Sequence, residues 1–176
     1  HSINVANISK TIIGRIYDLC ATESISATNL FKLNKKRAEL YAEITGLSHD
    51  LGHTPFGHTG EDVVNKFFQS ITDKKTIEKI IEHRKKYFGE EYEEKQGHVE
   101  GFEGKLSFEH NEQSATEFYK IVDNEEFSRV DRKKIIDGIL AHSISRVPEL
   151  PEDLIAQIIR QTDKIEYINN DLEEFK

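Results

Sequence analysis

Residues 49–61 read His-Asp-Leu-Gly-His-Thr-Pro-Phe-Gly-His-Thr-Gly-Glu, which places three histidines and two carboxylates within thirteen positions. The adjacent pair His49 and Asp50 sets a neutral imidazole beside a carboxylate, and both groups bind divalent metals. The histidines that follow and Glu61 can supply a proton-transfer group and contacts for an anionic substrate. This density of titratable side chains indicates a hydrolase centre that acts on phosphate.

The stretch lies among segments with helical periodicity. Apolar residues recur at steps of three or four over 2–19, 35–51, 60–70, 73–86, 108–122, 131–145 and from 154 onward, while 21–34 is predicted to be a loop. No period-two alternation persists, so the predicted fold class is all-α. Thr72 and Ser107 are the expected caps of two helices, and Asp131 is the expected start of a third. Val63, Val64, Phe67 and Phe68 are expected to face inward, and the apolar stripe that contains Ile165 and Ile168 is expected to lie along the core.

Length and composition suit one domain over residues 1–176. The net charge of -8 argues against a protein that binds nucleic acid mainly by neutralising phosphates. No apolar run reaches the roughly 18 residues that span a membrane, and the single cysteine, Cys20, fits a reducing cytoplasm. Because methionine is absent, even at position 1, we expect the chain to be a fragment of a longer protein. Residues 87–105 hold four glycines and many glutamates, which predicts a mobile connection or a lid over the site.

A catalytic metal ion needs several protein ligands and an open position for water. Neighbouring residues on a helix point about 100° apart, so His49 and Asp50 reach one ion most easily where the helix ends. Further ligands must come from other helices, and two candidates are His1 in the first helix and Asp163 in the last. Each has an ordinary alternative, since His1 could be a tag remnant, Asp163 a solvated side chain, and the His-Asp pair a common dipeptide.

Four sequence blocks occur in order along nearly the whole chain. They are His1-Ser2 with Val5-Ala6, the stretch 49–61, Phe108-Glu109-His110-Asn111-Glu112-Gln113-Ser114, and Asp163-Lys164-Ile165-Glu166-Tyr167-Ile168 with Asn170-Asp171. In these blocks the chain resembles the HD superfamily of metal-dependent phosphohydrolases, and most closely its deoxynucleoside triphosphate triphosphohydrolase (dGTPase-like) branch. The resemblance implies a single HD domain, which is a helical bundle with a central metal cleft.

The resemblance also assigns the metal and the catalytic groups. The implied metal ligands are His1, His49, Asp50 and Asp163. This set of two imidazoles and two carboxylates suits Mn, Fe, Co, Ni or Zn, and suits Mg less well. The implied catalytic histidine is His58 with its acid Glu61, while His53 and His110 would contact phosphate or donate protons. From the residues alone, His58 could equally be a surface histidine, with Glu61 favouring the N-terminus of the next helix.

Three residues of the last block are implied to hold the substrate. Lys164 would bind phosphate, Tyr167 would pack on deoxyribose, and Asp171 would meet the 3′-hydroxyl. Tyr167 and Asp171 share a helix face with Asp163, four and eight residues earlier. The alternative for Tyr167 is an ordinary core aromatic. No role is assigned to His83, His98 or His142.

The implied reaction is metal-dependent hydrolysis of a deoxynucleoside triphosphate, such as dGTP, to the deoxynucleoside and inorganic triphosphate. An activated water would attack the α-phosphorus while the histidines manage protons. One alternative is another HD phosphohydrolase, either a nucleoside monophosphate phosphatase or a cyclic-nucleotide phosphodiesterase. A second is a non-catalytic nucleotide-sensing or nucleic-acid-binding module, against which the intact ligand set argues. Family members are commonly longer, with a C-terminal part for base recognition and subunit contacts, so the full-length protein is expected to be a homo-oligomer.

Overall fold

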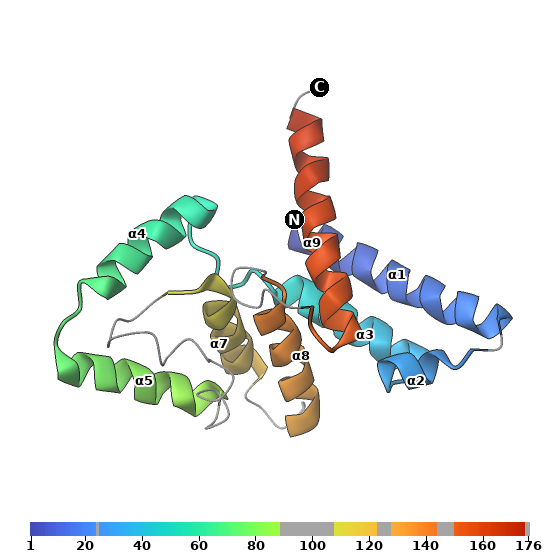
Figure 1. Ribbon diagram of the computed structural model, residues 1–176, viewed down its shortest axis with the longest axis horizontal. Helices are drawn as coiled ribbons and strands as arrows, with labels where there is room; N and C mark the ends of the chain where they lie inside the picture. The colour runs from blue at the N-terminus through green and yellow to red at the C-terminus, as the bar shows by residue number, and fades with distance from the viewer. Residues whose placement is uncertain (24, 89–107, 123–127, 144–149, 175–176) are drawn as a thin grey trace.

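The computed structural model describes residues 1–23, 25–88, 108–122, 128–143 and 150–174 (Figure 1). Its helices are α1 (Ser2–Thr22), α2 (Ala27–Phe31), α3 (Lys35–Ser48), α4 (Gly57–Gln69), α5 (Lys74–Phe88), α7 (His110–Val122), α8 (Arg129–Ala141) and α9 (Leu154–Glu174). No strand occurs in these ranges, which confirms the all-α prediction, and α2 is a short helix within the predicted loop 21–34. The connection predicted over 87–105 starts inside α5 and otherwise lies, with His98 and Ser107, outside the described residues. Across the described helices, none combines the length and the apolar composition that crossing a membrane requires.

α1 and α3 pack closely because small residues line their contact. A Cβ atom added at Gly46 of α3 would lie 2.7 Å from the Cα atom of Ala6 in α1, so only glycine permits this approach. The buried residues of α3 are Ala38, Tyr41, Ala42, Thr45, Gly46 and Ser48. Leu40 and Leu47, whose spacing helps to predict this helix, do not face the core. They are 48% and 44% exposed, because the small residues occupy the tight contact.

α8 and α9 complete the apolar core around this pair. Its fully buried side chains include Ile13, Ile135, Ile139 and Ile159, which come from α1, α8 and α9. The C-terminal end of α9 projects away from the other helices (Figure 1). Ile165 and Ile168 of α9 are 52% and 60% exposed, so the prediction that they face the core is wrong.

α4 and α5 lie to one side of the core, beyond α7 (Figure 1). Val63 and Phe67 of α4 are exposed, whereas Val64 and Phe68 are partly buried. The prediction of an inward face is therefore correct for Val64 and Phe68 and wrong for the other two. The reason is that α4 stands apart from the core helices and is covered on one side only.

Two helices begin at caps that differ from the predicted ones. Asp73, rather than Thr72, accepts a hydrogen bond from the Thr76 N–H over 2.8 Å at the start of α5. Ser128 caps α8 by accepting from the Asp131 N–H over 3.1 Å, so this helix starts two residues before the predicted position. In both cases several capping residues lie close together in the sequence, and only the backbone geometry selects one of them.

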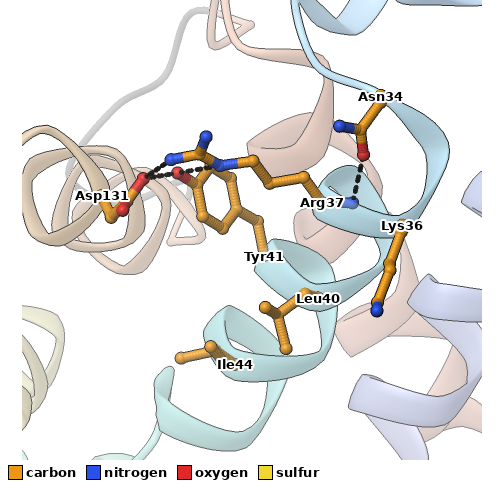
Figure 2. A pocket seen from close by; sticks show the side chains of 7 residues that line it. All are labelled: Asn34, Lys36, Arg37, Leu40, Tyr41, Ile44 and Asp131. Atoms are coloured by element: carbon orange, nitrogen blue, oxygen red, sulfur yellow. Dashed lines mark hydrogen bonds and ion pairs between the residues drawn. The ribbon is translucent and has the colours of Figure 1, made fainter. Parts of the chain in front are cut away.

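Asp131 also joins α8 to α3 beside a surface pocket of about 440 Å³ (Figure 2). One of its carboxylate oxygens accepts hydrogen bonds from the Arg37 guanidinium and the Tyr41 hydroxyl, and the other accepts from the Ser128 hydroxyl. The hydroxyls of Tyr41 and Ser128, together with the Arg37 guanidinium, hold the pKa of Asp131 below its ordinary value. The ionised carboxylate therefore ties two core helices together.

The variant Asp131→Asn should lose about 1–3 kcal/mol of unfolding free energy near neutral pH, the range for hydrogen bonds to a charged group. Because the pKa of Asp131 in the folded state lies below 3.8, the carboxylate stabilises the fold above that pH. This stabilisation is lost as the pH falls through the folded-state pKa. Denaturant unfolding of both proteins at neutral and acidic pH measures the difference.

The matched control is Asp137→Asn on the same helix. Asp137 forms an exposed ion pair with Lys133, with 3.6 Å between nitrogen and oxygen, so its loss should cost less than about 1 kcal/mol. If Asp131→Asn destabilised the protein equally at both pH values, the assigned role of the ionised carboxylate would be wrong.

Candidate metal centre

His49 directly follows α3, and its ring is oriented by its own helix. Its Nδ1–H donates to the carbonyl of Gly46 over 2.7 Å, so Nε2 points away from the helix end. The ring is fully buried, and its Nε2 makes no hydrogen bond within the described part of the chain. A buried nitrogen that makes no hydrogen bond is costly unless positive charge, from its own proton or from a bound cation, faces the carboxylates near it.

Close contacts to α7 and two residues with positive φ shape the turn after His49. The Gly52 N–H donates to the Ser114 hydroxyl of α7 over 2.9 Å, and a Cβ atom at Gly52 would lie 2.4 Å from the Ser114 backbone nitrogen. Phe56 and Gly57 have φ values of 68° and 60°, which turn the chain into α4. The turn thus brings the histidines of α4 and α7 close to the end of α3.

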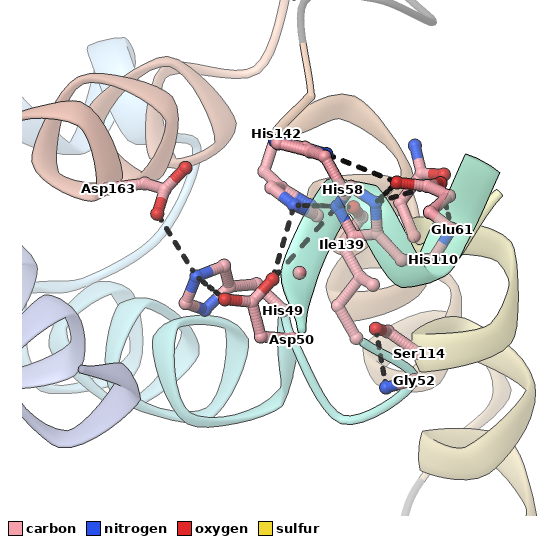
Figure 3. A network of polar contacts seen from close by, with 12 residues as sticks. His49, Asp50, Gly52, His58, Glu61, His110, Ser114, Ile139, His142 and Asp163 are labelled. Carbon is pink, nitrogen blue, oxygen red and sulfur yellow. Dashed lines mark hydrogen bonds and ion pairs between the residues drawn. The ribbon is translucent and has the colours of Figure 1, made fainter. Parts of the chain in front are cut away.

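Four predicted metal ligands meet where α1, α3 and α9 come together, and we call His1, His49, Asp50 and Asp163 the four-ligand group. His1 Nε2 lies 2.8 Å from Asp163 Oδ1 and 3.8 Å from Asp50 Oδ2. His49 Nε2 lies 3.3 Å from Asp50 Oδ2 and 3.4 Å from Asp163 Oδ1. One donor atom from each residue lies within 4.8 Å of the others. Figure 3 shows Asp163 of α9 facing the His49 and Asp50 pair.

The charges within the four-ligand group depend on one another. Burial disfavours a charged His49, but the nearby carboxylates of Asp163 and Asp50 raise its pKa to about 10. Burial also disfavours a charged Asp50, but His49 beside it lowers the pKa of that carboxyl to about 2. Two imidazoles and two carboxylates therefore surround a position that favours positive charge, and such a donor set fits a divalent ion.

Glu61 of α4 is the centre of a second group of titratable side chains. Its carboxylate accepts from the His110 backbone N–H over 3.0 Å, and it lies 3.1 Å from His110 Nδ1 and 3.2 Å from His58 Nδ1. Burial opposes ionisation of Glu61, but the His110 N–H and the two imidazoles lower its pKa. Because an ionised carboxylate only accepts, both neutral rings carry their proton on Nδ1 and leave Nε2 as an acceptor.

The structure brings together the four residues predicted to be catalytic, and we call His53, His58, Glu61 and His110 the Glu61 cluster. His53 stacks on the ring of His110 with 4.7 Å between ring centroids. The side chain of His58 is 80% exposed, so it lies at the rim where a ligand can reach it. Asn65 anchors α4 in this position, because its side chain bonds both the backbone N–H and the carbonyl of Phe108, just before α7.

The residues predicted to bind substrate lie along α9. Tyr167 packs against His1 with 4.5 Å between ring centroids, and burial raises the pKa of its hydroxyl to about 12. Lys164 and Asp171 are exposed on the same helix. Tyr167 is therefore beside the four-ligand group, whereas Lys164 and Asp171 face solvent.

His142 is part of the same site, although the sequence alone assigns it no role. It directly follows α8, and its Nε2 lies 3.2 Å from His110 Nε2 and 3.8 Å from Asp50 Oδ1. Burial lowers the pKa of its ring to about 4. Arg160 of α9 holds this helix end, because its guanidinium donates to the Ala141 carbonyl over 2.6 and 3.0 Å. A histidine at the end of an apolar helix is the only sequence feature that marks this position.

The HD domain family matches residues 1–168. Several relatives are named deoxyguanosinetriphosphate triphosphohydrolase-like protein. The one from Geobacter metallireducens is 30% identical over 180 residues, covering 92% of this chain and 37% of that protein. The one from Caldanaerobacter subterraneus is 28% identical over 174 residues, covering 99% and 34% respectively. A third, from Cereibacter sphaeroides, is 42% identical over 69 residues, covering 39% and 13%.

The chain therefore belongs to the HD domain family. Within that family, its named relatives place it in the dGTPase-like branch. The chain spans about a third of the length of the Geobacter and Caldanaerobacter relatives. No solved structure matches the chain significantly.

Proposed function

We propose that the chain carries the centre of a metal-dependent hydrolase that converts deoxynucleoside triphosphates to the deoxynucleoside and inorganic triphosphate. The observation that carries this proposal is the convergence of the four-ligand group from three helices, directly beside the Glu61 cluster. Metal ligands next to a proton-transfer group are the parts that phosphoester hydrolysis requires. The names of the relatives support a nucleoside triphosphate as the substrate class.

The four-ligand group would hold one divalent ion. When bound, such an ion supplies a water of lowered pKa and offsets negative charge on phosphate oxygens. The protein fixes the position in advance, because the ring of His49 is held by the Gly46 carbonyl. The side chains of Asp50 and Asp163 are 15% and 17% exposed, so the position is shielded from bulk water but open to a ligand.

The Glu61 cluster would accept and donate protons during the reaction. Ionised Glu61 orients His58 through Nδ1, which leaves His58 Nε2 to accept a proton or, once protonated, to donate it. The exposed position of His58 lets it reach the sugar oxygen that leaves the α-phosphorus. His53 would contact a phosphate oxygen, and its buried Nδ1 has no hydrogen-bond partner among the described residues.

α9 would bind the nucleoside end of the substrate. Tyr167 is 44% exposed and packs on His1, so it offers an aromatic surface beside the metal position. Asp171 lies one turn further along the same helix face, where it would accept a hydrogen bond from the 3′-hydroxyl. Exposed Lys164, next to a metal ligand in the chain, would approach the phosphates from the solvent side.

Product analysis tests the proposed function. The natural protein that carries residues 1–176 is incubated with each deoxynucleoside triphosphate and either Mn²⁺ or Mg²⁺, and the products are separated by ion-exchange chromatography. We expect the deoxynucleoside and inorganic triphosphate in equal amounts. Release of orthophosphate or pyrophosphate instead would indicate another phosphohydrolase. Nucleotide binding without turnover under all metals would also contradict the proposal.

A further inference from the structure

The start of α1 meets α9 in two polar contacts beside the four-ligand group. His1 Nε2 lies 2.8 Å from Asp163 Oδ1. Three residues further along both helices, the side-chain amide of Asn4 donates to Glu166 Oε1 over 2.7 Å. Residues three positions apart share a helix face, so the two contacts lie about one turn apart on the same side of each helix. The N-terminal end of α1 lies beside α9 in Figure 1.

The second of these contacts satisfies a buried acidic side chain. Glu166 is only 2% exposed, whereas Asn4 is at the surface. A carboxylate removed from water needs hydrogen-bond donors, because its desolvation is otherwise costly. Within the described part of the chain, Asn4 is the residue whose side chain donates to Glu166. The needs of Glu166 therefore fix the position of an otherwise exposed residue.

The backbone carries this constraint from Asn4 to His1. The Asn4 N–H donates to the His1 carbonyl over 2.8 Å, and the Val5 N–H donates to the same oxygen over 3.1 Å. Within α1, His1 provides no side-chain cap and the first turn holds no acidic residue. The contact with Glu166 thus anchors this helix end from outside, and a shift of Asn4 would move His1 with it.

The two contacts respond differently to a metal ion. A carboxylate only accepts, so the hydrogen bond from His1 to Asp163 requires a proton on Nε2. A metal requires the lone pair of that same nitrogen, so metal binding and this hydrogen bond exclude each other. The contact between Asn4 and Glu166 uses no atom of the four-ligand group. It therefore still joins the first turn of α1 to α9 when His1 is a ligand.

We propose that Asn4 and Glu166 are positioning residues of the metal centre, because their hydrogen bond keeps His1 within reach of the ion. Tyr167 follows Glu166 in the chain and packs on the His1 ring with 4.5 Å between ring centroids. The same contact therefore also holds the aromatic surface proposed for the sugar. This inference rests on the proposed function, but it concerns residues outside the four-ligand group and predicts metal affinity rather than turnover.

Reversing the polarity of the pair tests this role. In Asn4→Asp two carboxylates would face each other, and both only accept, so the start of α1 should move away from α9. We expect the dissociation constant for Mn²⁺, measured by calorimetric titration of the natural protein, to rise about tenfold or more, as is usual when a group that orients a metal ligand is lost. The double variant Asn4→Asp/Glu166→Gln again pairs a donor with an acceptor at unchanged side-chain size, so its affinity should return close to that of the wild type.

Two single variants serve as controls. Glu166→Gln should bind Mn²⁺ nearly as well as the wild type, because its amide oxygen still accepts from Asn4. Glu43→Gln weakens a different contact of α1, in which Lys10 donates to Glu43 of α3 over 2.6 Å. It should leave the affinity for Mn²⁺ unchanged, which separates a specific effect on His1 from a general loosening of α1.

Wild-type affinity in Asn4→Asp would overturn the positioning role, and so would a double variant that binds as weakly as Asn4→Asp. Circular dichroism of the metal-free proteins checks folding. If Asn4→Asp does not fold, Asn4→Ala replaces it, and this variant should also bind Mn²⁺ more weakly. The two proposals can fail separately. The expected affinities without triphosphate release would contradict only the proposed function, whereas triphosphate release with unchanged affinity in Asn4→Asp would contradict only the positioning role.

Discussion

Replacing Asp50 with alanine should abolish both divalent-metal binding and hydrolysis. Asp50 directs Oδ2 towards His49 in the four-ligand group and Oδ1 towards His110 and His142, so one substitution removes a proposed metal ligand and the carboxylate beside both buried imidazoles. It also removes one of the two carboxylates that hold positive charge near the buried Nε2 of His49. In the variant, Asp163 is the carboxylate of this pair that still faces His49 Nε2.

Calorimetric titration with Mn²⁺ and assays of triphosphate release measure the effect of Asp50→Ala. The control is Asp18→Ala, because Asp18 is an exposed aspartate of α1 that pairs with Lys35 over 2.5 Å. This control should bind metal and turn over like the wild type, since exposed ion pairs contribute little. If Asp50→Ala bound Mn²⁺ with wild-type affinity and kept its activity, the assignment of the metal centre would have to be abandoned.

The variant His58→Ala should keep its metal but lose turnover by about 10²–10⁴-fold, the usual contribution of a general acid or base. His58 is not in the four-ligand group, so its removal leaves the proposed metal ligands in place. Its ring is oriented by Glu61, 3.2 Å from Nδ1, and its 80% exposed side chain can reach a substrate. The loss should fall on kcat, because the proton is transferred only as the bond to the sugar oxygen breaks.

Steady-state kinetics and metal analysis of the same preparation separate these effects. His83→Ala serves as the control for removal of an exposed histidine and should leave kcat unchanged. Glu61→Gln should also lower kcat, because an amide oxygen accepts from His58 Nδ1–H more weakly than an ionised carboxylate does. A His58→Ala protein with wild-type kcat would assign proton transfer to another group, and loss of metal from it would place His58 among the ligands.

Much of this architecture follows from local patterns in the sequence. Apolar steps of three or four residues predicted every long helix that the structure describes, because burial on a helix repeats with the helical turn. The pair His49 and Asp50 is a common dipeptide by itself, and it pointed to a metal site only together with the histidines and Glu61 that follow it. His1 and Asp163 needed the resemblance to a family, since no local pattern links residues 162 positions apart.

Other features could not be predicted, because they depend on what packs against each face. An amphipathic stripe indicates an apolar face without indicating what covers it, so the exposure of Phe67 and Ile168 did not follow from their spacing. The buried face of α3 consists mainly of small residues, which carry a weak hydrophobic pattern. The sequence around His142 contains no recognisable motif, because the role of this residue depends on its contacts with His110 and Asp50, which lie far away in the sequence.

The four-ligand group joins the first and last helices of the chain through side chains 162 positions apart. An ion held there would act as a cross-link that must open before α9 can separate from α1. Metal binding would then be coupled to folding. Metal at about 100 times its dissociation constant would raise the free energy of unfolding by roughly 2.7 kcal/mol. For such a protein a chelator would also favour unfolding. A shortage of metal in the cell would then lower its stability as well as its activity.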